Sequence, residues 1–325
     1  MNPAKPKVQH YVPRLILKRF AEENEQVWVF DKKRSSVFKT NISKIAAEKY
    51  FYDFEYEGYD LSLESTFENL ESGASEVIDH ITLENSLASL SDEERILFSK
   101  FLALQLVRTR QWRNMWEQAR EDLLVAIRKM GFKPEQIEGY KEQSNEDPKL
   151  AHMRSIHKSF EYTPYFLNKF WVLFTAPEKR PFWISDNPLT LQNMHDFGYF
   201  GNLGLAVKGI EIYFPISKCH TLGLLCPSHL EMFKKTYKDY ISLSNASPQM
   251  AAEAVDKPLL LEQIRAAVED RRAIPYNFEN VINHNSLQVM FSTRFIFSSN
   301  NDFSLAEEMI NAHPEYREGP KMEVR

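Results

Sequence analysis

Four separate stretches of the chain carry side chains that could exchange protons or hold a charged ligand. The first is "HYVPRLILKRF", in which His10 and Tyr11 stand together just before Pro13 and a run with helical spacing. Because histidine exchanges protons near neutral pH, His10 is a candidate general base or acid, with Tyr11 beside it. A histidine this close to a chain terminus is more often a surface or capping residue, and that alternative stays open.

The second stretch is "LALQLVRTR", in which Arg108 follows Gln105 by about one helical turn. The run "ILFSKFLALQLV" is apolar nearly all round, which predicts a helix buried on several sides. A buried guanidinium needs an anionic partner, because an unpaired buried charge is strongly unfavourable. Arg108 is therefore either a clamp for a substrate phosphate or carboxylate, or one half of an internal salt bridge. The candidate partners for a salt bridge are Glu64, Glu68 and Glu71.

The third stretch, "FWISDNPLT", places Ser185, Asp186 and Asn187 directly after an apolar run and before Pro188. Polar groups at the end of a strand, followed by a stiff proline turn, can present a catalytic carboxylate. The alternative is equally physical, since aspartate and asparagine often hydrogen-bond their own backbone in turns.

The fourth stretch is acidic and contains Glu64, Glu68 and Glu71. The pattern from Leu61 onward predicts a helix, on which these three residues line a face beside the apolar stripe. Carboxylates are the ligands that Mg²⁺ and Mn²⁺ prefer, so the stripe could bind a metal or supply a general base. Carboxylates on a helix also commonly form a plain solvated face.

The sequence pattern also predicts the helices and strands that must position these groups. It favours an α+β fold, predominantly helical, with a central mixed or antiparallel sheet built from the N-terminal and C-terminal halves. "QVWVFDKKRSSVFKT" predicts a hairpin, and Ser91 with Glu94 forms a capping box that opens a helix running to about Met130. Later strands are predicted at "WVLFTAP", "PFWISDNPLTL", "IEIYFPIS", "HTLGLLCP" and "RFIFSS", and later helices at "HLEMFKKTYKDYI", "PLLLEQIRAAVEDRRA" and "NVINHNSLQVMFSTR". We expect a single domain over 1–310 with a surface loop at 131–150, and a frayed tail over 311–325.

Composition narrows the class of protein. The 325 residues carry a net charge of −5 and only 10 glycines, with neither G-x-G-x-x-G nor G-x-x-x-x-G-K-[ST], so the common nucleotide-binding loops are not expected. The two cysteines, Cys219 and Cys226, are too few for a structural zinc site. The chain shows neither the roughly 18-residue apolar run of a membrane helix nor a signal-peptide core near its start. We expect a cytoplasmic protein with no membrane partner.

Taken in order, "HYVPRLILKRF", "ESTFENLESGA", "LALQLVRTR", "FWISDNPLT", "IYFPISKCHTLGLL" and "VINHNSLQVMFSTRFIFSS" resemble the mainly bacterial family catalogued as domain of unknown function 4238. The resemblance covers nearly the whole chain. Arg14 stands where members carry glutamine, and Arg110 replaces the proline of a common Arg-Thr-Pro, which lets the helix run on past Arg110. The positions that match the polar pattern of the family are His10, Tyr11, Glu64, Glu71, Gln105, Arg108, Ser185, Asp186, Asn187 and Asn283.

The resemblance implies that these residues meet in one site, without assigning a reaction. From their chemistry we expect metal-assisted or acid–base hydrolysis of a phosphodiester or nucleotide, nuclease-like and in bacterial defence. The catalytic candidates are His10, Tyr11, Arg108, Asp186 and Asn187, the substrate-binding candidates are Gln105, Ser185 and Asn283, and the metal candidates, for Mg²⁺ or Mn²⁺, are Glu64, Glu71 and Asp186. The alternative is a non-catalytic sensor that binds a ligand or nucleic acid, in which the polar cluster is a structural network.

Overall fold

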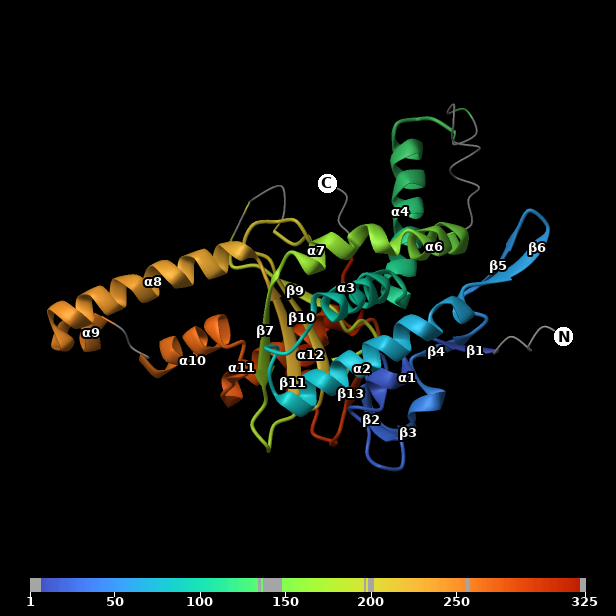
Figure 1. Cartoon of the computed structure of the whole chain (residues 1–325). Helices are drawn as coiled ribbons and strands as arrows, with labels where there is room; N and C mark the ends of the chain where they lie inside the picture. Colours follow the sequence, from blue (N-terminus) through green and yellow to red (C-terminus); the bar gives the residue numbers. More distant parts are fainter. Residues whose placement is uncertain are drawn as a thin grey trace.

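The computed structural model of the chain describes residues 7–133, 136, 148–195, 197, 202–254 and 258–321 (Figure 1). It confirms the α+β class, with more helix than strand. The α-helices in these ranges are α1 (Arg14–Leu17), α2 (Glu68–Glu84), α3 (Asp92–Val107), α4 (Arg110–Lys129), α6 (Pro148–His157), α7 (Thr163–Leu167), α8 (Pro227–Ala246), α9 (Pro248–Ala254), α10 (Pro258–Glu269), α11 (Phe278–Phe291) and α12 (Ser304–Ala312). None of these helices combines the length and the apolar character needed to cross a membrane.

A four-stranded antiparallel sheet joins the two halves of the chain, as the sequence predicts. Its order is β3 (Ser36–Asn41), β2 (Gln26–Asp31), β13 (Phe295–Ser298) and β8 (Ile184–Ser185). The predicted hairpin is the β2–β3 pair, in which Asp31 lies opposite Ser36. Since β8 ends at Ser185 and pairs with the start of β13, the Ser-Asp-Asn turn lies against the chain that enters β13.

A five-stranded sheet is formed by the second half of the chain. Its order is β12 (Ile274–Pro275), β7 (Phe170–Thr175), β11 (His220–Leu225), β10 (Glu211–Ser217) and β9 (Thr190–Gln192). Only the β12–β7 pair is parallel among these strands. Cys219 and Cys226 flank β11 as free thiols.

Two small antiparallel ribbons complete the sheet structure near the N-terminus. The first pairs β1 (Val8–His10) with β4 (Ala47–Lys49), and the second pairs β5 (Asp53–Tyr56) with β6 (Tyr59–Ser62). Figure 1 shows the β5–β6 ribbon extending away from the body of the protein on the side of the N-terminus.

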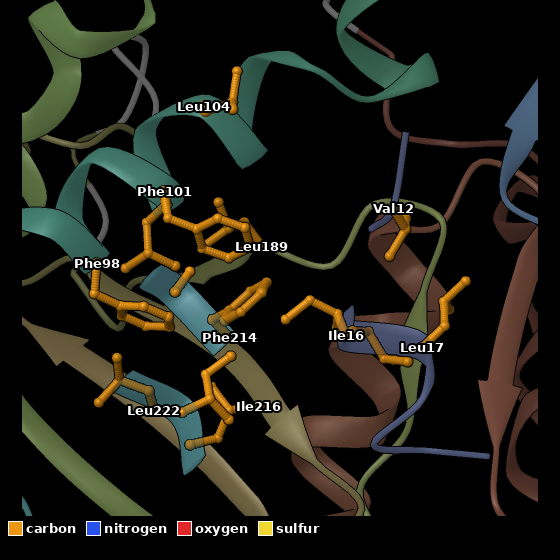
Figure 2. Close-up of a cluster of buried hydrophobic side chains, with 14 of the residues drawn as sticks. Val12, Ile16, Leu17, Phe98, Phe101, Leu104, Leu189, Phe214, Ile216 and Leu222 are labelled. Carbon is orange, nitrogen blue, oxygen red and sulfur yellow. The ribbon is translucent and has the colours of Figure 1, made fainter. Parts of the chain in front are cut away.

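The main core is centred on α3, whose buried residues face several sides of the helix, as its apolar sequence predicts. Figure 2 shows Phe98 and Phe101 of this helix beside Phe214 of β10, with Ile16 and Leu17 of α1 nearby. The capping box at the start of α3 is present in both directions, from Ser91 to the backbone of Glu94 and back. The core therefore places the N-terminal segment against the C-terminal end of α3.

The prediction of one helix from Ser91 to about Met130 is wrong in one respect. The segment forms two helices, because α3 ends at Val107 and α4 begins at Arg110. Arg108 ends α3, and Thr109 has extended backbone angles and accepts a hydrogen bond from the amide of Trp112 as the cap of α4. The threonine thus caps the start of α4, and no proline or glycine stands at the break. At this break Arg108 is buried.

Three further segments differ from their predictions or lie partly outside the described ranges. The helix predicted from Leu61 begins only at Glu68, after β6 and a short 3-10 helix, η2 (Glu64–Thr66). The predicted loop at 131–150 falls largely on residues outside the described ranges. The segment predicted to fray from Asn311 is placed against the domain as far as Lys321, since Gln111 donates a hydrogen bond to the carbonyl of Pro320.

Candidate functional site

The His-Tyr pair is held by backbone contacts rather than by a helix. His10 is the last residue of β1 and lies opposite Ala47, and the amides of Tyr11 and Val12 both donate to the carbonyl of Ala46. The Nε2–H of His10 donates to the carbonyl of Ile42 (3.3 Å), which leaves Nδ1 as the proton acceptor of the neutral ring. Burial lowers the pKa of His10 below its usual value, so the neutral ring dominates at pH 7.

Arg108 is buried and has three partners within the protein. Nε donates to Oη of Tyr52 (3.0 Å), Nη1 to Oε1 of Glu71 (2.6 Å), and Nη2 to the carbonyl of His10 (2.9 Å). The guanidinium also lies over the ring of Phe67, 4.7 Å from its centroid. Although burial alone lowers it, the pKa of Arg108 is raised overall by Tyr52 and Glu71. Of the two readings from sequence, this geometry favours the internal salt bridge, with Glu71 as the partner.

Gln105 and Tyr11 complete the support of the N-terminal segment. Nε2 of Gln105 donates to the carbonyl of Tyr11 (3.1 Å), so α3 holds both carbonyls of the His-Tyr pair. The Tyr11 ring is buried, and its burial raises the pKa of the phenol well above the usual range. A neutral buried phenol of this kind packs in the core and is not poised for proton transfer near neutral pH.

Glu64 is an acidic group whose protonation changes near neutral pH. It opens η2, and its Oε2 atom is buried without a hydrogen-bond partner in the described part of the chain. Burial, assisted by the charges of Glu71 and Asp53 and opposed by that of Arg108, raises the pKa of Glu64 to about 7. Arg108 therefore acts electrostatically on Glu64 and bonds the backbone of His10, which puts these residues in one cluster that we call the N-terminal cluster: His10, Tyr52, Glu64, Glu71 and Arg108.

The Ser-Asp-Asn turn forms a second cluster. The buried carboxylate of Asp186 accepts the amide of Thr293 (2.7 Å) on Oδ1, and those of Arg294 (2.8 Å) and Phe295 (2.9 Å) on Oδ2. Complete burial raises the pKa of Asp186, while these donors and the charge of Lys32 oppose the rise. Asp186 thus binds the segment that enters β13.

The side chains of Ser185 and Asn187 are also hydrogen-bonded within the protein. Oγ of Ser185 donates to Oε1 of Gln288 (2.7 Å), and the Asn187 side chain donates to the carbonyl of Phe291 (3.0 Å). Nε2 of Gln288 returns a bond to the carbonyl of Pro188 (3.0 Å). These contacts tie the turn to the C-terminal end of α11.

The structure does not bring all the predicted site residues together. His10, Arg108 and Glu71 share one hydrogen-bonded cluster, whereas the hydrogen bonds of Asp186 described above lead to the backbone before β13. Asn283 lies elsewhere, exposed on α11, where it contacts Gln192 (3.4 Å). Within the described ranges no three histidine, cysteine or acidic side chains are grouped so that they could hold a metal ion. The proposed ligand set of Glu64, Glu71 and Asp186 is therefore not assembled.

Sequence reasoning missed three residues that organise these clusters. Tyr52 donates to the carbonyl of His10 (3.1 Å) and accepts from Arg108, yet "KYFYDF" indicates only a strand. Lys32, in the charged turn of the β2–β3 hairpin, is buried and donates to the carbonyls of Val289 (2.8 Å) and Ser292 (2.6 Å). Gln288 had a usable signal, since it follows Asn285 at helical spacing and both face β8.

The chain matches a known protein family over most of its length. Residues 8–302 match the family described as "Protein of unknown function (DUF4238)". No curated protein and no solved structure matches the chain. Because the match spans most of the 325 residues, the chain belongs to the DUF4238 family.

Proposed function

We propose that the chain is an acid–base hydrolase of a phosphodiester or nucleotide, with Glu64 and His10 as the catalytic pair. The observation that carries this proposal is the buried, unpartnered Oε2 of Glu64, on a carboxyl whose pKa is raised to about 7. A general acid is most effective when its pKa lies near the working pH. A carboxyl that is partly protonated at neutral pH meets this condition.

The neutral ring of His10 supplies the complementary base. Water loses a proton to Nδ1 of His10 as its oxygen bonds to phosphorus, and the P–O bond to the leaving group breaks. Glu64 donates its proton to the leaving oxygen, so a diester and water give a monoester and an alcohol. The imidazolium then releases its proton to solvent, and the carboxylate of Glu64 takes one up.

The Glu71–Arg108 pair acts by positioning. Arg108 bonds the carbonyl of His10 and the carboxylate of Glu71, and it faces no solvent. Its charge opposes the pKa rise of Glu64, while that of Glu71 adds to it, so the pair sets the acidity of the donor. Asp186 and Asn187 have no role in this scheme, because their polar groups bind backbone near β13.

The test is hydrolysis of nucleotides and of single-stranded oligonucleotides by purified protein, with EDTA, Mg²⁺ or Mn²⁺. We expect turnover by the wild type and a loss of about 10²- to 10⁴-fold in Glu64→Gln and His10→Asn. Glu76→Gln is the matched control, because Glu76 is an exposed carboxylate further along α2. If the wild type leaves every substrate intact under all three conditions, the proposal fails.

One observation supports a second candidate, a non-catalytic ligand-binding or sensor protein. The polar groups of the Ser-Asp-Asn turn are buried and satisfied by the protein itself, as in a structural network. The variant His10→Ala separates the candidates. A hydrolase keeps its melting temperature and loses turnover, whereas a structural network loses melting temperature first.

A further inference from the structure

A serine, a histidine and a glutamate are hydrogen-bonded in series between α2 and α3. Oγ of Ser89 lies 2.8 Å from Nε2 of His80, and Nδ1 of the same ring lies 2.8 Å from Oε1 of Glu94. The bond from His80 lowers the pKa of Glu94, which is therefore ionised at pH 7. Because a carboxylate only accepts, Nδ1 of the neutral ring carries its proton, and Nε2 accepts the hydroxyl proton of Ser89. Hydrolases with a serine nucleophile connect nucleophile, base and orienting carboxylate in this way.

The surrounding backbone holds these three side chains in place. His80 lies on α2, and Glu94 is fixed by the capping box of α3, in which its Oε2 atom accepts a backbone amide (2.8 Å). The loop that carries Ser89 is anchored at the buried Leu87, whose amide donates to the carbonyl of Arg271 (2.9 Å). The side chains of His80 and Glu94 are each 31% exposed, and Ser89 is exposed. A substrate can therefore reach the serine hydroxyl from solvent.

The first turn of α3 supplies donors for an oxyanion. The amide of Glu94 bonds Oγ of Ser91 (3.1 Å). The amides of Asp92 and Glu93 stand at the first two positions of the helix, where no carbonyl of the same helix can accept them. Such amides, together with the dipole of a 16-residue helix, stabilise a developing negative charge. They follow Ser89 closely in the chain.

The surface around Ser89 favours an uncharged substrate with an apolar acyl group. Glu84, the last residue of α2, and Asp92 and Glu93, the first of α3, are exposed carboxylates, which repel an anionic substrate. Leu83 lies beside the imidazole, because it follows His80 by three residues on α2, and it is 84% exposed. Among acyl compounds an ester needs the least help from the protein, since an alcohol leaves more readily than an amine.

We propose that Ser89, His80 and Glu94 form a second catalytic site, which hydrolyses uncharged carboxylic esters. Oγ of Ser89 bonds to the carbonyl carbon as its proton passes to Nε2 of His80. The C–O bond to the alcohol then breaks as that proton passes to the leaving oxygen. Water adds to the acylated serine and gives a proton to Nε2, and the bond from Oγ to the acyl carbon breaks as the proton returns to Oγ. An ester and water thus give an acid and an alcohol.

This site is separate from the N-terminal cluster. His80 follows Glu71 by nine residues on α2. This spacing puts His80 about 13 Å further along the axis and on the opposite side of the helix. The two sites share no residue, so ester hydrolysis does not depend on the proposed phosphodiester hydrolysis, and either activity can fail alone.

Covalent labelling and steady-state kinetics test the site. An alkyl fluorophosphonate, located by mass spectrometry, should label Ser89 of the wild type. With 4-nitrophenyl butyrate as substrate, Ser89→Ala and His80→Gln should each lower kcat at least about 10²-fold. The double variant should lose no more than either single variant, because the two groups act as a unit. The 4-nitrophenyl monoester of succinic acid, which carries a carboxylate, should show a several-fold lower kcat/KM.

Ser242→Ala is the matched control, because Ser242 is an exposed serine on α8. Glu94→Gln retains the cap, since glutamine also serves in a capping box, and it should lower kcat with KM and melting temperature near those of the wild type. Nucleotide hydrolysis should be the same in Ser89→Ala as in the wild type.

The site is overturned if the wild type leaves the butyrate ester intact, if Ser89 is not labelled, or if Ser89→Ala hydrolyses the ester as fast as Ser242→Ala. A Glu94→Gln variant that loses only melting temperature would make Glu94 a helix cap alone and remove the carboxylate from the site. Equal kcat/KM for the two esters would contradict the preference for an uncharged substrate.

Discussion

Replacing Asp186 by asparagine tests whether the Ser-Asp-Asn turn is structural. In the structure its Oδ2 atom accepts two amides, from Arg294 at 2.8 Å and Phe295 at 2.9 Å, and Oδ1 accepts that of Thr293 at 2.7 Å. Asparagine keeps one acceptor and turns an NH₂ group toward the other donors. Two buried amides then lose their acceptor, at about 1–3 kcal/mol each.

Removal of the buried charge offsets part of this loss, since burial disfavours the ionised form of Asp186. We expect the free energy of unfolding to fall by about 3 kcal/mol in Asp186→Asn. The assay is urea denaturation followed by tryptophan fluorescence, with Asp239→Asn, an exposed aspartate on α8, as the control. A change below about 1 kcal/mol, together with a large loss of hydrolysis, would refute the reasoning and make Asp186 catalytic.

Three further predictions concern the N-terminal cluster. Arg108→Met should lower the unfolding free energy by about 3–5 kcal/mol, because it leaves Glu71 without its partner. In a double-mutant cycle, the variant that combines Arg108→Met with Glu71→Gln should lose less unfolding free energy than the sum of the two single variants. Additive losses would contradict the pairing. Because folding raises the pKa of Glu64 from 4.5 to about 7, the folded chain binds more protons than the unfolded chain between these values, and stability from this group is lost as pH rises through them. Glu64→Gln should therefore melt above the wild type at pH 8 and close to it at pH 4.5 in calorimetry, and equal offsets at both pH values would refute this. The pH profile of kcat/KM should be bell-shaped, rising through the lowered pKa of His10 and falling near pH 7, and a profile that keeps rising above pH 8 would exclude Glu64 as the acid.

Local sequence patterns predict much of the fold because they depend on short-range chemistry. The capping box at Ser91 and the β2–β3 hairpin follow from residues a few positions apart. The break at Thr109 was not predictable in the same way, since Arg-Thr-Arg contains no helix breaker. At this break Arg108 bonds Tyr52 and Glu71, which are distant in sequence, so no pattern of neighbouring residues contains these contacts.

In the candidate site, too, some features follow from residue type and others depend on contacts between distant residues. Residue type alone predicts that Arg108 needs an anionic partner and leaves three glutamates as choices, of which the fold selects Glu71. Asp186 accepts backbone amides near β13, whereas Arg108 bonds the backbone of His10. Residue type does not predict this separation, because the same residues could form one polar cluster or two. Nor does it predict a raised pKa at Glu64, which requires burial of one carboxylate oxygen.

The protonation of Glu64 can be measured directly by carbon-13 NMR of its side-chain carboxyl as a function of pH, with Glu64→Gln to assign the signal. The proposed hydrolase requires a midpoint near pH 7, well above the ordinary 4.5. A midpoint near 4.5 would leave the carboxylate fully ionised at neutral pH and would remove the proton donor from the mechanism.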